Sequence, residues 1–274
     1  MSKKHGFTAG WALSLIAAGG VAHAHAATGS QGRYGSSASR RVEGRVIRAS
    51  GDISQEVEEF RAALGGPLNN NEPQQQRAGR REINWDGVPA NITNTPDFPG
   101  DFFNSFEPAD PPARKRGATF FAENEGSFEV SDKNFAEVDP SYGRQFQAFS
   151  APKTFMVRGG NTLEVRFQAV GAPTPALVKG FGVVFSDVDK NGSARIELLG
   201  DNGVRLGTVT APPRSDARGL SFVGVVFDNP LITSALITSG EAALDPGVQD
   251  ISAGGTSDLV VMDDFIYGEP QAIE

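Results

Sequence analysis

The 274-residue sequence contains no cysteine, and its three histidines all lie within the first 25 residues. These absences exclude a disulfide framework, a Ser-His-Asp triad, a Cys-His pair and a histidine-based zinc or iron site from the remaining chain. No glycine-rich phosphate loop opens a helix either. Because only carboxylates, Tyr, Lys and Arg remain for acid–base chemistry, we expect a non-enzyme. A carboxylate-dependent glycosidase or lyase remains the catalytic alternative.

Long hydrophobic runs are also missing. The longest near the start, Trp11–Val21, covers about 11 residues, whereas a membrane span needs about 20. Lysines precede this run, and small residues follow it at the positions required for cleavage after Ala24 or Ala26. Residues 1–26 are therefore predicted to be a signal peptide, with no membrane span. A cysteine-free exported chain further indicates a secreted bacterial protein, extracellular or periplasmic.

Positive charge is scarce after residue 81. Residues 1–81 carry 11 basic and 6 acidic side chains, a net charge of +5, whereas residues 82–274 carry 14 basic and 27 acidic ones, a net charge of −13. An acidic body disfavours nucleic acid and anionic membranes as partners. It is compatible with divalent cations, or with surface acids that serve solubility alone.

Three segments are predicted to precede the main domain. Residues 27–49 are rich in Gly, Ser and Arg, which predicts a flexible leader. Residues 50–66 are predicted to form an amphipathic helix that ends at a Gly-Gly-Pro stop, and residues 67–81 a polar linker. The helix docks either on its own domain or on a partner. Its apolar stripe consists of Ile53, Val57, Phe60 and Leu64.

Residues 82–270 contain short apolar segments at spacings of about ten residues, which predicts an all-β fold. Thr162–Ala169 alternates apolar and polar side chains, as in a half-buried strand. Gly180–Ser186 and Leu220–Phe227 are nearly continuous apolar runs, typical of central strands. We expect an antiparallel β-sandwich or jelly roll with one short N-terminal helix.

One acidic motif follows the first of these runs. It places oxygen side chains at positions 1, 3 and 5 and glycine at position 6, as a calcium loop does: Asp187-Val-Asp189-Lys-Asn191-Gly192. Position 12, where a bidentate Glu belongs, is Leu198. The alternative interpretation, which we favour, is a β-hairpin turn, because Asn-Gly is the strongest short hairpin signal.

A second acidic motif, Asp263-Asp264, lies inside the last predicted strand. Adjacent strand residues face opposite sides, so one of these acids points to the interior or to a ligand unless a bulge intervenes. A buried carboxylate needs a partner or a metal, and Asp86 is a plausible co-ligand if the first and last strands are neighbours. The alternative is an edge strand with both acids solvated.

The segments EINWDG, FGVVFSDVD and VVMDDFIYGEP together resemble secreted bacterial jelly-roll domains of the carbohydrate-binding-module or lectin-like kind. The resemblance covers residues 82–270. It implies a structural Ca²⁺ held by a first-strand acid, Glu82 or Asp86, and a last-strand acid, Asp263 or Asp264.

Glycan-binding faces stack sugars on exposed aromatic rings. The retained candidates are Trp85, the only tryptophan after the signal peptide, and Tyr142. Four loop phenylalanines offer either a ligand patch or a plug for the end of the sandwich: Phe98, Phe102, Phe103 and Phe106.

We therefore expect a secreted, non-catalytic binding module with a structural Ca²⁺ and a glycan or cell-surface ligand. A structural or adhesive extracellular protein is the alternative from another class. The candidate metal ligands are Glu82, Asp86, Asp187, Asp189, Asn191, Asp263 and Asp264.

Overall fold

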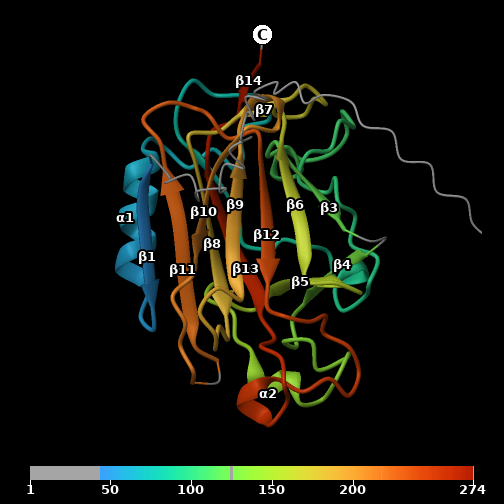
Figure 1. Ribbon diagram of the computed structural model, residues 1–274. Coiled ribbons are helices and arrows are strands. Elements are labelled where there is room, and N and C mark those ends of the chain that lie inside the picture. Colours follow the sequence, from blue (N-terminus) through green and yellow to red (C-terminus); the bar gives the residue numbers. More distant parts are fainter. Residues whose placement is uncertain (1–43, 124–125, 217, 274) are drawn as a thin grey trace, which may run out of the picture. The chain divides into compact units, whose positions relative to one another are not determined.

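The structure, a computed structural model, describes residues 44–123, 126–216 and 218–273. Antiparallel strands dominate this part of the chain and form two main sheets (Figure 1). The predicted antiparallel β-sandwich with one N-terminal helix is confirmed.

The larger sheet has seven strands: β1 (Arg45–Ser50), β11 (Leu220–Val226), β8 (Gly180–Ser186), β13 (Val261–Gly268), β5 (Thr154–Arg158) and β4 (Ser127–Ser131) in order, with β2 (Arg80–Ile83) paired to β13. The second sheet has the order β10 (Arg205–Thr210), β9 (Ala194–Leu199), β12 (Ser234–Ser239), β6 (Thr162–Phe167) and β3 (Ala118–Ala122). A small third sheet pairs β14 (Gln271–Ala272) with β7 (Ala176–Leu177). The helices are α1 (Ser54–Leu64) and α2 (Tyr142–Gln145), and short 3₁₀ turns span Ala90–Ile92, Pro112–Arg114, Asp201–Gly203 and Ile251–Ala253.

The main core includes the facing side chains of the two large sheets. Strand β6 buries Leu163, Val165 and Phe167 and leaves the residues between them at least partly accessible, as its alternation predicts. Strand β8 is buried at all seven positions. It needs apolar residues on both faces because one face lies against the core and the other lies beneath α1.

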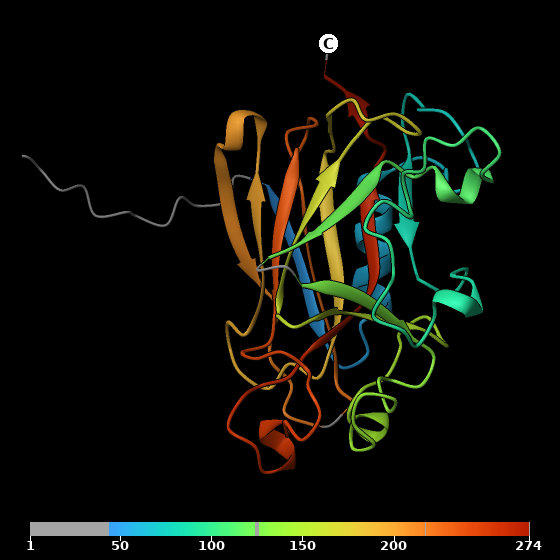
Figure 2. The same ribbon diagram turned by 90° about the vertical axis from the view of Figure 1, so that its right-hand side faces the viewer.

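Helix α1 docks on its own domain, which settles the alternative left open by the sequence. All four stripe residues are buried, and they pack with Val184, Phe222 and Ile266 on the outer face of the seven-stranded sheet. Figure 2 shows α1 on the side of this sheet that faces away from β9 and β10. Phe60 lies over two glycines: a Cβ on Gly182 or Gly224 would come within 2.9 or 2.5 Å of its ring. The glycines therefore provide the space that the Phe60 ring occupies.

Strand β1 corrects the prediction of a flexible leader over residues 45–49. It pairs antiparallel with β11 from Arg45↔Val226 to Ser50↔Ser221. Backbone hydrogen bonds to the sheet edge hold this segment, and Ile47 is its only fully buried side chain. The segment therefore carries little hydrophobic signal. The predicted signal peptide and the remainder of the leader, to residue 43, lie outside the described residues.

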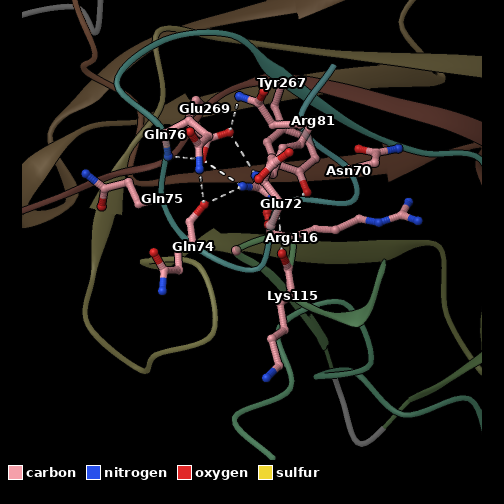
Figure 3. A network of polar contacts seen from close by, with 12 residues as sticks. Asn70, Glu72, Gln74, Gln75, Gln76, Arg81, Lys115, Arg116, Tyr267 and Glu269 are labelled. Carbon is pink, nitrogen blue, oxygen red and sulfur yellow. Dashed lines mark hydrogen bonds and ion pairs between the residues drawn. The ribbon is translucent and has the colours of Figure 1, made fainter. Parts of the chain in front are cut away.

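The predicted linker over residues 67–81 is also wrong at its buried positions. The Arg81 guanidinium, fully buried, donates from Nε to Glu269 Oε2 at 2.8 Å and from Nη2 to Glu269 Oε1 at 2.9 Å. Asn69 donates to the same carboxylate at 3.0 Å, and the Gln76 backbone N–H does so at 2.9 Å. Figure 3 shows the segment around Gln74–Gln76 wrapped against this pair. Its polar side chains are bound to the domain, so their polarity does not signal flexibility.

None of the helices in the described part of the chain has the length and apolar character that a membrane span requires.

Candidate functional site

The candidate site is formed by two chain connections at one end of the sandwich, in the lower part of Figure 1. Asp187 and Asp189 lie between β8 and β9, and Asp250 and Asp258 lie between β12 and β13. Each connection joins a strand of one large sheet to a strand of the other. The hairpin interpretation of residues 187–192 is therefore wrong, because β8 and β9 do not pair with each other.

Three carboxylates meet at this end. Asp187, Asp189 and Asp250 each offer an oxygen, and these oxygens all lie within 4.8 Å of one another. The fourth, Asp258, is fully buried beside them. Its Oδ2 accepts hydrogen bonds from the backbone N–H groups of Asp189 at 3.0 Å and Lys190 at 2.7 Å, and from Ser193 Oγ at 2.6 Å. The two connections are thus joined through the carboxylates themselves.

Four oxygens of this cluster are buried and have no hydrogen-bond partner: Asp187 Oδ1, both carboxylate oxygens of Asp189, and Asp258 Oδ1. The other oxygens are bound within the protein. Asp187 Oδ2 accepts from Gln145 Nε2, and Asp250 accepts from the backbone N–H groups of Ser252 at 2.6 Å and Leu259 at 2.7 Å. Buried polar atoms are nearly always satisfied in folded proteins. The four unsatisfied oxygen atoms therefore lack a hydrogen-bond donor or a cation, and all four lie in the same cluster.

Burial and mutual repulsion raise the pKa values of these acids. Burial raises the pKa of Asp187 to about 8; the hydrogen bond from Gln145 opposes this increase, and the negative charges of Asp250, Asp189 and Asp258 add smaller increases. Burial and the adjacent Asp250 carboxyl raise the pKa of Asp189 to about 7, and burial also raises the pKa of Asp258. A divalent cation would remove this repulsion by supplying positive charge to all the carboxylates.

The donor set fits a hard cation. Ca²⁺ takes about six to eight oxygen ligands, commonly carboxylates, and carboxylates are the only groups gathered here with unsatisfied atoms. Zinc prefers Cys and His ligands, which this site lacks. The donor set of the cluster therefore suits a hard divalent cation such as Ca²⁺.

The structure assembles only part of the predicted calcium motif. Asp187 and Asp189 enter the cluster, whereas the side chain of Asn191 is exposed. Asp250 and Asp258 were missed by sequence reasoning. They lie far later in the chain, and no local spacing connects them with the first motif.

The second group of predicted ligands is held by protein donors instead. Strand β2 pairs with β13, as the sequence interpretation required, and the register of β13 shifts between Met262 and Phe265. Strand β13 lies inside the sheet and is buried at all eight positions, which include Asp263 and Asp264, so the alternative of a solvated edge strand is wrong. Burial raises the pKa of Asp263 well above its usual value and that of Asp264 to about 6.

Each acid of this second group has partners. Asp263 Oδ2 accepts from the backbone N–H groups of Phe149 at 2.5 Å and Ser150 at 3.0 Å. Asp264 accepts from Ser150 Oγ at 2.5 Å and lies 3.3 Å from Arg61, which also binds Glu82 at 2.7 Å. Asp86 accepts from the Lys153 N–H at 3.3 Å and from Asn84 at 3.2 Å. These contacts account for Glu82, Asp86, Asp263 and Asp264 without a metal.

The two predicted sugar-stacking residues have no exposed ring face. Trp85 is 0% exposed; it stacks on Phe155 at 4.0 Å and donates from Nε1 to the Asp263 carbonyl at 2.9 Å. Tyr142 is 1% exposed and donates to the carbonyls of Asp245 and Val248. Their prediction as stacking platforms is wrong because the core takes up both rings. Of the loop phenylalanines, Phe98, Phe102 and Phe103 join the main core, and Phe106 is exposed.

Comparisons with known proteins found only distant structural similarities. No family model matches the chain, and no curated protein matches it. Among solved structures, the enzymatically active domain of bacteriophage CBA120 tailspike protein 4 aligns with a TM-score of 0.29 and 8% identity, over 66% of this chain and 22% of that one. The chain thus spans less than a quarter of that domain's length.

The CBM22-1 xylan-binding domain from Paenibacillus barcinonensis Xyn10C aligns with a TM-score of 0.26 and 11% identity, over 64% of this chain and 98% of that domain. A further xylan-binding domain of CBM 22 has a TM-score of 0.19 and 12% identity, over 62% of this chain and 83% of that domain. Two xylan-binding domains are therefore among the similar structures. Similarity this low carries no argument about the ligand of this chain.

Proposed function

We propose that this chain is a secreted, non-catalytic binding module with a structural Ca²⁺ and a glycan or cell-surface ligand. The observation that carries the calcium proposal is the set of buried, unsatisfied carboxylate oxygens shared by Asp187, Asp189 and Asp258 beside Asp250. Export rests on the sequence of residues 1–26, and the absence of histidine and cysteine from the rest of the chain supports binding over catalysis.

Calcium at this site would act on the connections between the sheets. Asp187 and Asp189 belong to the β8–β9 connection, and Asp250 and Asp258 belong to the β12–β13 connection. When bound, the ion supplies the positive charge that four neighbouring carboxylates need in order to stay ionised at neutral pH. The residues themselves hold the two connections together, because Asp258 already binds the Asp189 and Lys190 N–H groups.

The test is a thermal melt of the full chain in EDTA and in a few millimolar Ca²⁺, repeated for Asp189→Asn and for Asp264→Asn. A ligand that binds only the folded state stabilises it by about 2.7 kcal/mol at a hundredfold excess over Kd, and this raises Tm by several degrees for a domain of this size. We expect wild type and Asp264→Asn to show this rise and Asp189→Asn to lose most of it.

Asp189→Asn gives a second signature, because both carboxylate oxygens of Asp189 are unsatisfied. In EDTA its neutral amide relieves repulsion among the acids, so we expect its Tm to equal or exceed that of wild type. In Ca²⁺ we expect the order to reverse. Absence of any calcium-dependent rise in the Tm of wild type would contradict the metal site. Loss of the rise only in Asp264→Asn would show that the ion binds at Asp263 and Asp264 and not at the Asp187–Asp189–Asp250 cluster.

A further inference from the structure

Arg116 is a partly buried cation without an ionic partner. Its Nη1 donates to the Glu82 carbonyl at 2.6 Å, and its guanidinium carbon lies 5.0 Å from the centre of the Phe103 ring. Its Nε is buried and has no hydrogen-bond partner, and it takes part in no ion pair with the described residues. In Figure 3 the side chain extends away from the Arg81–Glu269 pair. A charge removed from water in this way normally has an anion beside it.

Arg116 lines a small cavity. The cavity has a volume of about 140 Å³, and its wall is mainly apolar. Arg114 is the second cation on the wall, with its guanidinium 4.5 Å over the Phe102 ring and 2.9 Å from Asp110. Trp85 borders the cavity although it has no solvent-exposed surface of its own. The residues that define the cavity are Trp85, Phe102, Phe103, Pro111, Arg114 and Arg116.

We propose that this cavity binds a compact ring that carries a carboxylate, such as the uronic acid residue of a glycan. The carboxylate would supply the missing partner of the Arg116 guanidinium, which matches carboxylates in shape and charge. The ring would lie against the apolar wall formed by Phe102, Phe103 and Pro111, since Trp85 has no accessible surface for it to contact. A cavity of about 150 Å³ holds one benzene molecule. The cavity therefore takes the carboxylate-bearing side of the sugar ring, and the remaining hydroxyl groups would stay outside it.

The local positive charge at this cavity favours binding of an anion there, whereas the rest of the domain is acidic. Residues 82–274 carry a net charge of −13, which repels anions in general. The cavity wall, in contrast, carries two cations, Arg114 and Arg116. An inorganic anion would satisfy the guanidinium but would leave the aromatic wall without a partner. The proposal rests on the proposed function in that the chain is taken to be a binding module; it does not depend on calcium.

The experiment is isothermal titration calorimetry of the full chain in EDTA with three probes at equal ionic strength. The probes are sodium glucuronate, cyclohexanecarboxylate and glucose. Tryptophan fluorescence in a Trp11→Phe background locates binding, because Trp85 is then the only tryptophan of the two in the sequence. We expect saturable binding of glucuronate with a change in Trp85 emission, and none of glucose.

Arg116→Gln is expected to weaken glucuronate binding about tenfold or more, since it removes a charged hydrogen bond. Arg195→Gln is the matched control, because Arg195 is exposed and donates only to the Gly192 carbonyl. It should bind as wild type does. Should Arg116→Gln fold poorly by circular dichroism, Ala113→Phe fills the cavity without altering charge and is expected to abolish binding.

The outcomes distinguish a glycan uronate from another cyclic acid, and they distinguish failure of the cavity proposal from failure of the proposed function. Binding of glucuronate alone supports a glycan residue, and binding of both carboxylates supports a cyclic acid of either source. The cavity proposal is overturned if neither carboxylate shows saturable binding, or if binding is unchanged in Arg116→Gln and Ala113→Phe. In that case a calcium-dependent rise in Tm would still support the proposed function. Turnover of a uronate-containing glycan would overturn the non-catalytic assignment and leave the cavity intact.

Discussion

At the scale of the residue, what distinguishes the buried charges is whether the protein supplies a partner. Arg81 and Glu269 satisfy each other with two hydrogen bonds. Glu129 has a weaker partner, because its ion pair with Arg158 is long, at 3.5 Å. The Glu137 carboxyl also lies within hydrogen-bonding reach of Glu129. Burial first, and the hydrogen bond with Glu137 second, raise the pKa of Glu129 to about 7.

This raised pKa makes stability depend on pH in a definite direction. The folded state holds the Glu129 proton up to a pKa of about 7, whereas the unfolded state releases it near 4.5. The free energy of unfolding contributed by this group is therefore greatest below pH 4.5 and falls as the pH rises to 7. Glu129→Gln should lose less stability between pH 5 and pH 8 than wild type does in urea titrations. Exposed Glu107→Gln is the control, and identical pH profiles for all three proteins would contradict the assignment.

At the scale of the element, helix α1 is stabilised by packing its apolar face on the outer face of the seven-stranded sheet. A helix of 11 residues is marginal in water by itself, so its stability comes from the face that it buries. That face lies on β1, β8, β11 and β13, and Phe60 contacts Phe222 edge-to-face with the ring centres 5.3 Å apart. The glycines of β8 and β11 beneath it leave no side chain to fill the space if the ring is lost.

Phe60→Ala is accordingly expected to lower the free energy of unfolding by about 3–5 kcal/mol, as large-to-small core substitutions do. Gln55→Ala, on the exposed side of the same helix, should change it by no more than about 0.5 kcal/mol. Chemical denaturation measures both. A similarly small loss in the two variants would show that α1 is only loosely attached to the sheet.

At the scale of the whole molecule, the acidic cluster joins both large sheets through their connections. Calcium binding should therefore act locally before it acts on the sheets. Hydrogen exchange measured by mass spectrometry is expected to slow on calcium addition at the amides that donate to the cluster, namely those of Asp189, Lys190, Ser252 and Leu259. The β1–β11 pair is the internal control. Slowing confined to that pair would contradict a metal at the connections.

Much of the architecture could be predicted because it follows from local periodicity. The two-residue alternation of β6 and the helical stripe that ends at Leu64 each depend on neighbouring residues alone. The first and last predicted strands are neighbours, which was the condition for Asp86 as a co-ligand, although the acids on the last strand bind Arg61 and backbone N–H groups. Strand β1 escaped prediction because an edge strand held by backbone hydrogen bonds needs few apolar side chains.

The sequence by itself determined the sandwich and the N-terminal helix, because short-range pattern suffices for these. Only the tertiary structure decided which acids meet. Asp187 and Asp250 are brought together by connections that cross between two sheets, and no spacing along the chain encodes that meeting. The tertiary structure also decided that Trp85 packs in the core and that Arg116 borders a cavity, because burial depends on the packing of distant segments.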